Sequence, residues 1–127
     1  MARTQLGTGA KWEDTVGYSR AVKVGNIIEI AGTTASKGGK VIFEGDVYNQ
    51  TRYILGIMAH VLHQLDGKLE DVVRTRIYLK RIEDWEEAGR AHGEFFHTIK
   101  PVSTMLAVSS LIHPDMLVEI EATAIIT

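Results

Sequence analysis

Tyr18 and Arg20 have the types and the spacing to bind an anion. They are two residues apart in a segment rich in β-branched residues, so in a strand they share one face. An arginine guanidinium there could bind a carboxylate through paired, charge-assisted hydrogen bonds. The alternative is an ordinary strand-end arginine in solvent or in a weak ion pair. Both interpretations of Arg20 remain open.

Other reactive side chains do not form a recognisable catalytic or metal motif. Ser103 and Thr104 have no histidine or lysine placed by sequence to activate them as nucleophiles. His60 and His63 are three apart on an expected helix, but a third ligand is missing, so we predict no metal site. The sequence has no cysteine, which excludes disulfides and thiolate chemistry.

Composition excludes several classes of partner. The formal net charge of −2 gives little attraction to phosphate backbones, and no glycine cluster has the form of a phosphate loop, so we expect no nucleic-acid or nucleotide binding. No stretch approaches the ~20 apolar residues of a membrane span. Residues 1–11 do not resemble a secretory signal, so we expect a cytoplasmic protein. The length of 127 residues predicts a single domain, 1–127.

The N-terminal third predicts strands. Residues 18–24 and 27–33 are rich in β-branched and aromatic residues and flank Gly25-Asn26, which predicts an antiparallel hairpin. A third, short strand is expected at Val41-Ile42-Phe43 after the Gly38-Gly39 pair. Residues before Tyr18 show no strong periodicity, so they could fold over a cleft or form a mobile arm.

Two helices are predicted. The first runs from an N-cap at Asp46 to Leu65 before Gly67, since its apolar residues recur at steps of three and four. These residues are Ile54, Leu55, Met58, Val61, Leu62 and Leu65. The second is expected from Asp84 to about His97, with an apolar face of Trp85, Ala88, His92, Phe95 and Phe96.

Three further strands complete the expected fold. Residues 72–80 alternate, with Val73, Thr75, Ile77 and Leu79 opposite Arg74, Arg76 and Tyr78. Residues 105–108 and 118–126 follow, the last as a half-polar central strand. The order predicts an α+β fold in which two helices cover one face of a mixed sheet. On the other face we expect charge pairs, with Arg76–Glu119 as the specific hypothesis.

Three segments of the chain resemble the YjgF/YER057c/UK114 family, also called the Rid family. They are Tyr18-Ser19-Arg20-Ala21-Val22-Lys23-Val24-Gly25-Asn26, Gln50-Thr51-Arg52 and Leu117-Val118-Glu119-Ile120-Glu121-Ala122, and the spacing between them also agrees. The resemblance implies a chorismate-mutase-like fold, a homotrimer whose sheets form a barrel, and ligand clefts between subunits. It also implies hydrolysis of enamines and imines such as 2-aminoacrylate, without cofactor or metal.

The resemblance implies a cleft whose contents have changed. Tyr18, Gly32 and Glu119 match a cleft tyrosine, a backbone-donor glycine and a glutamate that positions water. The family's Pro-x-Arg-Ser pattern reads Pro101-Val102-Ser103-Thr104 here, so serine replaces the arginine that binds the substrate carboxylate. The exchange removes a hydrogen bond to a charged group, about 1.5–3 kcal/mol. Gly89 and Met105 also replace a cleft asparagine and a common cysteine.

We therefore expect a homotrimer that binds a small, carboxylate-bearing metabolite around Tyr18, Arg20, Gly32, Gly89, Ser103, Thr104 and Met105, with Glu119 as the candidate catalytic residue. The missing arginine argues against the usual deaminase activity. Enamine or imine hydrolysis remains an alternative in which Arg20, Arg52 or a neighbouring subunit supplies the anion contact. A scaffold or chaperone-like role is the third interpretation.

Overall fold

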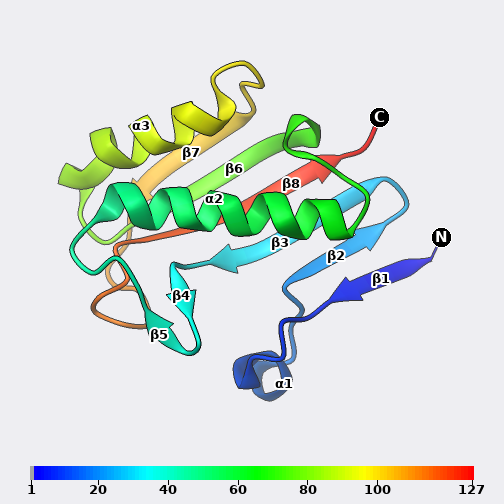
Figure 1. Cartoon of the computed structure of the whole chain (residues 1–127), viewed down its shortest axis with the longest axis horizontal. Helices are drawn as coiled ribbons and strands as arrows, with labels where there is room; N and C mark the ends of the chain where they lie inside the picture. The colour runs from blue at the N-terminus through cyan, green and yellow to red at the C-terminus, as the bar shows by residue number, and fades with distance from the viewer. Residues whose placement is uncertain (1) are drawn as a thin grey trace.

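A six-stranded mixed sheet forms one layer of the protein, in a computed structural model that describes residues 2–127 (Figure 1). The strand order is β1-β2-β3-β8-β6-β7, with β6 and β7 parallel and all other neighbours antiparallel. The strands are β1 (Arg3–Leu6), β2 (Ala21–Val24), β3 (Ile27–Thr33), β6 (Val72–Leu79), β7 (Val102–Ala107) and β8 (Val118–Ile125). A separate small hairpin pairs β4 (Ser36–Lys37) with β5 (Lys40–Val41).

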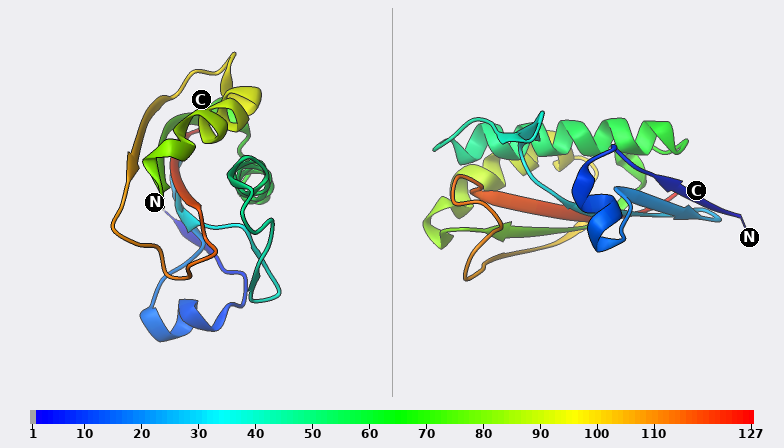
Figure 2. Two further views of the ribbon diagram at one scale, coloured as in Figure 1. Left: turned by 90° about the vertical axis from the view of Figure 1, so that its left-hand side faces the viewer. Right: turned by 90° about the horizontal axis from the view of Figure 1, so that it is seen from below.

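Two long helices cover one face of this sheet, and the other face is open (Figure 2). They are α2 (Val47–Gln64) and α3 (Trp85–Phe96), joined to their neighbouring strands through the short 3₁₀ helices η1 (Leu69–Asp71) and η2 (Ile82–Asp84). Asp46 caps α2, because its Oδ1 accepts the backbone N–H of Asn49 at 3.0 Å. The predicted α+β fold with two helices on one face is confirmed.

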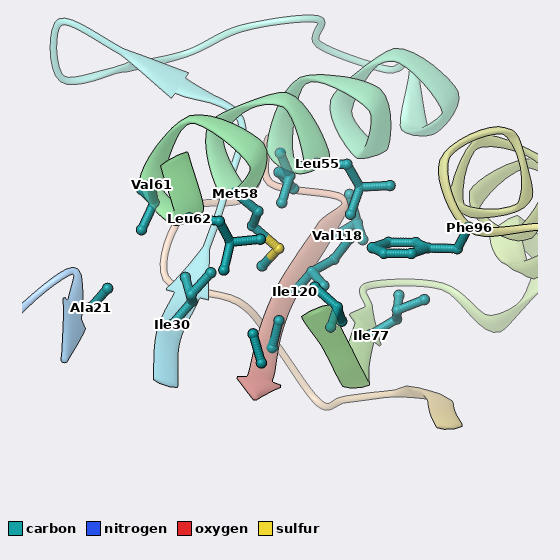
Figure 3. Close-up of a cluster of buried hydrophobic side chains, with 14 of the residues drawn as sticks. Ala21, Ile30, Leu55, Met58, Val61, Leu62, Ile77, Phe96, Val118 and Ile120 are labelled. Carbon is teal, nitrogen blue, oxygen red and sulfur yellow. The ribbon is translucent and has the colours of Figure 1, made fainter. Parts of the chain in front are cut away.

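The core lies between α2, α3 and the sheet (Figure 3). The predicted apolar stripe of α2 is buried, with Ile54, Leu55 and Leu62 at 0% exposure. The stripe packs against strand residues that alternate inward, and burial of each such side chain stabilises the fold by about 1.5–3 kcal/mol. The inward strand residues include Ile28, Ile30, Ile77, Leu79, Val118 and Ile120. As predicted, β8 is central, lying between β3 and β6.

The first hairpin is confirmed at its turn, but β2 begins at Ala21, so residues 18–20 precede the strand and are not part of it as predicted. Strand β2 ends at Val24, β3 begins at Ile27, and Gly25 has φ 59°, a left-handed value that glycine adopts without a steric penalty. The side chain of Asn26 donates to the carbonyl of Ile126 at 3.1 Å. The turn therefore also attaches the C-terminal end of the chain to the sheet.

The N-terminal segment is ordered into two elements that periodicity did not predict. Strand β1 pairs with β2, and α1 (Lys11–Val16) follows it. Glu13 connects α1 to the residues that follow β1. The Glu13 carboxylate accepts hydrogen bonds from the backbone N–H of Thr8 at 3.0 Å and from the hydroxyl of Thr8 at 2.6 Å. The hydroxyl bond is the main reason that the pKa of Glu13 is lowered. The segment is thus held in place next to Tyr18.

Four details of the prediction were wrong. The third strand is replaced by the β4–β5 hairpin, and Phe43 lies beyond it with φ 54°. Strand β7 begins at Val102, three residues before the prediction. Val73 is exposed, because an irregularity between Val72 and Arg74 shifts the alternation of β6 by one residue. Trp85, the first residue of α3, is 54% exposed and is not part of the buried face of the helix.

No helix within residues 2–127 is long and apolar enough to cross a membrane.

Candidate functional site

Tyr18, Arg20, Gly32 and Glu119 form a first cluster, where β2, β3 and β8 lie side by side. Arg20 Nη1 donates to the carbonyl of Gly32 at 2.8 Å and to Oγ1 of Thr33 at 2.9 Å. The guanidinium carbon lies 5.7 Å from the centre of the Tyr18 ring, although both residues precede β2 and are not in the strand that was predicted for them. Within residues 2–127, Nη1 is the one guanidinium nitrogen of Arg20 that makes a hydrogen bond.

Glu119 enters the first cluster by packing on the backbone of Gly32. A Cβ atom at position 32 would lie 2.4 Å from Oε2 of Glu119, closer than real contacts allow. Burial raises the pKa of Glu119, its neighbour Glu121 adds to the rise, and Arg20 opposes it. A half-buried carboxyl with a raised pKa, close to a cation, is typical of groups that exchange protons with a ligand.

The predicted Arg76–Glu119 pair is not the one that forms within the chain. Sheet register places Arg76 opposite Glu121, and their Nε and Oε1 atoms are 3.9 Å apart. The hydroxyl of Tyr78 also donates to Glu121 at 2.5 Å. The hypothesis had the right strands but was out of register by two residues, and Glu119 remains available to the first cluster.

A second cluster consists of Gly89, Ser103 and Met105, at the edge of the sheet under α3. A Cβ at Gly89 would lie 3.9 Å from Cε of Met105, and Ser103 stands opposite Thr75 on β6. Thr104 points to the other face, because side chains alternate along β7, and it stands opposite Arg76. Of the three adjacent residues predicted to bind substrate, Ser103 and Met105 therefore share a face and Thr104 does not.

The two clusters do not meet within one chain. Strand β6 lies between β8 and β7, which separates Glu119 from Ser103 by two strand spacings across the sheet, about 10 Å. The two residues are also offset along β6, because Glu119 faces Tyr78 and Ser103 faces Thr75. Glu119 is on the open face of the sheet, whereas Ser103 is on the face covered by helices. A broad surface hollow of about 670 Å³ is lined by Tyr18 alone of the first cluster and by no residue of the second. Within one chain the two clusters thus do not line a common pocket.

The endoribonuclease L-PSP family model matches residues 8–126, nearly the whole chain. The chain belongs to this family. A crystal structure of Rv2704 from Mycobacterium tuberculosis, described as a member of the YjgF/YER057c/UK114 family, is similar over 98% of this chain and 100% of that one, with 43% identity and a TM-score of 0.90. The family resemblance found in the sequence is confirmed.

Sequence relatives of this L-PSP family member include a named enzyme. An uncharacterised protein of Streptomyces coelicolor is 38% identical over 92% of this chain and 87% of its own length. The 3-aminoacrylate deaminase RutC of Acinetobacter baylyi is 31% identical over 84% of this chain and 85% of its own length. The deaminase is thus a more distant relative than the uncharacterised protein.

Two residues of this family member that sequence reasoning left unassigned lie next to Ser103. Thr75 is fully buried, and its Oγ1 is 2.8 Å from Oγ of Ser103 and 2.9 Å from Nε2 of His92. The ring of His92 also packs on Phe96, with centroids 4.6 Å apart. The alternation of β6 predicted that Thr75 faces inward, and the helical pattern predicted the same of His92. Neither pattern predicts that the two side chains form a hydrogen bond.

The remaining polar candidates lie away from both clusters. Arg52 is on the outer surface of the helices, where its Nη1 donates to Glu94 at 2.6 Å and its guanidinium carbon lies 5.3 Å from the ring centre of Phe95. It is therefore not placed to contact a ligand at either cluster of the same chain. Across residues 2–127, no group of three metal-ligating side chains is close enough to hold a metal ion, His60 and His63 included.

Proposed function

We propose that this L-PSP family protein binds a small carboxylate-bearing metabolite, such as a 2-oxo acid, in clefts between the subunits of a homotrimer. One observation carries the proposal: the matched site residues form two clusters that a single chain keeps apart on opposite faces of its sheet. Association of the β7 edge of one copy with the first cluster of another would bring them together. It would also cover part of the open, charged sheet face.

Arg20 is the proposed anion contact in place of the family's arginine. Its Nη1 is held by Gly32 and Thr33, which fixes the direction of the guanidinium, while Nε and Nη2 have no hydrogen-bond partner within residues 2–127. A guanidinium fixed by the backbone loses little side-chain freedom on binding. Tyr18, 39% exposed, contributes an apolar ring and a hydroxyl beside it.

Hydrolysis of an enamine or imine is a second candidate function, and Glu119 is the observation in its favour. Its raised pKa suits a group that accepts a proton from water and returns it to the leaving ammonia. The 31% identity to a 3-aminoacrylate deaminase agrees with this chemistry. Against it, Ser103 offers only a neutral hydrogen bond where the family's arginine would bind the substrate carboxylate.

Isothermal titration calorimetry with pyruvate tests the binding proposal. We expect saturable binding that Arg20→Ala weakens by about tenfold or more, since a hydrogen bond to a charged group contributes about 1.5–3 kcal/mol. Arg81→Ala is the matched control, because Arg81 is exposed and its nearest acid is Glu83, 3.5 Å away. Equal affinities of the two variants would exclude Arg20 as the anion contact.

Two further measurements separate the candidate functions. Keto-acid production from freshly generated 2-aminoacrylate, abolished in Glu119→Gln, would establish the hydrolase, whereas binding without turnover would establish the binding protein. Protection of aggregating clients without saturable ligand binding would instead support the scaffold interpretation. If light scattering found only single chains at working concentration, there would be no cleft between subunits. Both the binding proposal and the hydrolase proposal would then be overturned.

A further inference from the structure

Three polar side chains from three elements form a hydrogen-bonded chain that ends at Ser103. Thr75 on β6 is at its centre, with 0% exposure, so no water can satisfy its hydroxyl. Its Oγ1 donates to Oγ of Ser103 on β7 at 2.8 Å and lies 2.9 Å from Nε2 of His92 on α3. The chain therefore runs from a histidine packed under α3 to an exposed serine at the sheet edge.

The direction of this chain follows from the number of hydrogens. A threonine hydroxyl has one hydrogen, and Thr75 gives it to Ser103. Nε2 of His92 must then carry a hydrogen and donate to Thr75, which assigns the Nε2–H tautomer. With the opposite tautomer, Thr75 would donate to His92, and Ser103 would have to donate to Thr75. The tautomer of His92 thus decides whether the hydrogen of Ser103 is used inside the protein.

In the arrangement that the structure shows, the hydrogen of Ser103 is left for an external acceptor. Its Oγ already accepts from Thr75, so its O–H bond can turn outward. Hydrogen bonds in a chain polarise one another, and each bond strengthens the next by roughly 10–30%. Ser103 is accordingly a better donor than an isolated serine, and its lone pairs are less available to a donor group of a ligand.

We infer that Thr75 and His92 are positioning residues that make Ser103 a hydrogen-bond donor to an oxygen atom of the ligand. The inference rests on the proposed function and narrows it, because it selects ligands that present a carboxylate or carbonyl oxygen at the second cluster. A ligand that presents an ammonium or amide N–H there meets only the one remaining lone pair of Ser103 Oγ, because the other already accepts from Thr75. Ser103 thereby retains part of the recognition that the family's arginine supplies.

Nitrogen-15 NMR of His92 in the ligand-free protein tests the chain independently of any ligand. We expect the Nε2–H tautomer in the wild type and a mixture of tautomers in Thr75→Val, a variant of similar shape that lacks the hydroxyl. The Nδ1–H tautomer in the wild type would overturn the inference, whatever the protein binds. A change in the folded state of Thr75→Val would not affect the wild-type result.

A double-mutant cycle with pyruvate tests the consequence for binding. We expect Ser103→Ala to weaken binding about tenfold and Thr75→Val about threefold, with the double variant no weaker than Ser103→Ala, because Thr75 acts only through Ser103. His92→Gln, which keeps an N–H donor, should bind as the wild type does, and His92→Leu should resemble Thr75→Val.

The outcomes distinguish this inference from the proposed function. Pyruvate binding that depends on Arg20 but is unchanged in Ser103→Ala would leave the proposed function in place and overturn the donor role. Fully additive losses in the double variant would do the same, since they would mean that Thr75 acts on the ligand or fold by another route. A wild-type protein that binds no pyruvate would overturn the proposed function and the donor role, while the NMR result still decides the direction of the chain.

Discussion

Replacement of Gly32 by alanine should displace Glu119 without altering the backbone. The new Cβ would lie 2.4 Å from Oε2, 3.0 Å from Cδ and 3.3 Å from Cγ of Glu119, whereas ordinary van der Waals contact begins at 3.4 Å. The carboxylate must therefore move by about 1 Å. Gly32 does not have a positive φ, so alanine brings no backbone strain of that kind.

The expected loss of stability is modest. Inserting a methyl group into a packed site costs about 1–3 kcal/mol, and the lower end applies because the atoms in the way belong to a side chain and can move. About 1 kcal/mol corresponds to a decrease of roughly 4 °C in Tm for a domain of this size. Displacement toward solvent should also lower the pKa of Glu119 toward its ordinary value, since burial is the main cause of the rise.

Gly56→Ala is the matched control for this substitution. Gly56 lies within α2, and a Cβ there would meet no atom within 4 Å. Alanine should stabilise the helix by about 0.8–1 kcal/mol, so Tm should rise rather than fall. Thermal unfolding at one fixed protein concentration gives both shifts, and NMR titration of Glu119 gives its pKa.

We therefore expect Gly32→Ala to lower Tm and Gly56→Ala to raise it. If Gly32→Ala were as stable as the wild type and left the pKa of Glu119 unchanged, the close approach of Glu119 to the Gly32 backbone would not exist in solution. The geometry of the first cluster would then be wrong, and the proposal that Glu119 acts on the ligand would lose its basis.

Two other substitutions test the energetics of buried polar groups. Glu119→Gln should be more stable than the wild type at pH 7. The raised pKa means that the folded protein holds the Glu119 proton more tightly than the unfolded chain does. The stability of the wild type therefore falls as the pH rises from the ordinary pKa of 4.5 through the raised pKa of the folded protein. In urea unfolding the advantage should disappear well below pH 4.5, and a constant difference across pH would contradict the raised pKa. Gln50→Leu should lower the unfolding free energy by about 3–5 kcal/mol, because the fully buried amide donates to three carbonyls, those of Ile42, Phe43 and Asp115, and accepts from Leu117 N–H at 2.9 Å. A loss below 1 kcal/mol in the same assay would show that these four bonds do not hold the segments 42–43 and 115–117 against α2.

The elements that the sequence predicted well are those with a strong local pattern. The stripe of α2 and the alternation of β8 each give the element one apolar face. The apolar face of each element is buried as expected. Strand β1 and α1 escaped prediction because their order comes from pairing with β2 and from the two hydrogen bonds to Glu13. No periodic pattern records such contacts.

Parts of the candidate site could also be predicted. Tyr18 and Arg20 are close in sequence, and their side chains do lie near each other, although both precede β2 and strand alternation does not place them. Ser103 was assigned to the site by the resemblance of Pro101-Val102-Ser103-Thr104 to the family's Pro-x-Arg-Ser pattern. The partner of Arg76 was missed because register between β6 and β8 depends on how the strands pair, and a shift of two residues replaces Glu119 by Glu121.

By itself, the sequence predicted the two helices, the turn of the first hairpin and, through a resemblance, the family. The helices and the turn follow from hydrophobic periodicity and turn residues, which act over a few positions, and the family follows from the resemblance of three segments. Only the tertiary structure decided that Glu119 rests on Gly32 and that His92, Thr75 and Ser103 form one chain. Those contacts join residues at least 17 positions apart. They arise only when β3 pairs with β8, when β6 pairs with β7 and when α3 packs on the sheet.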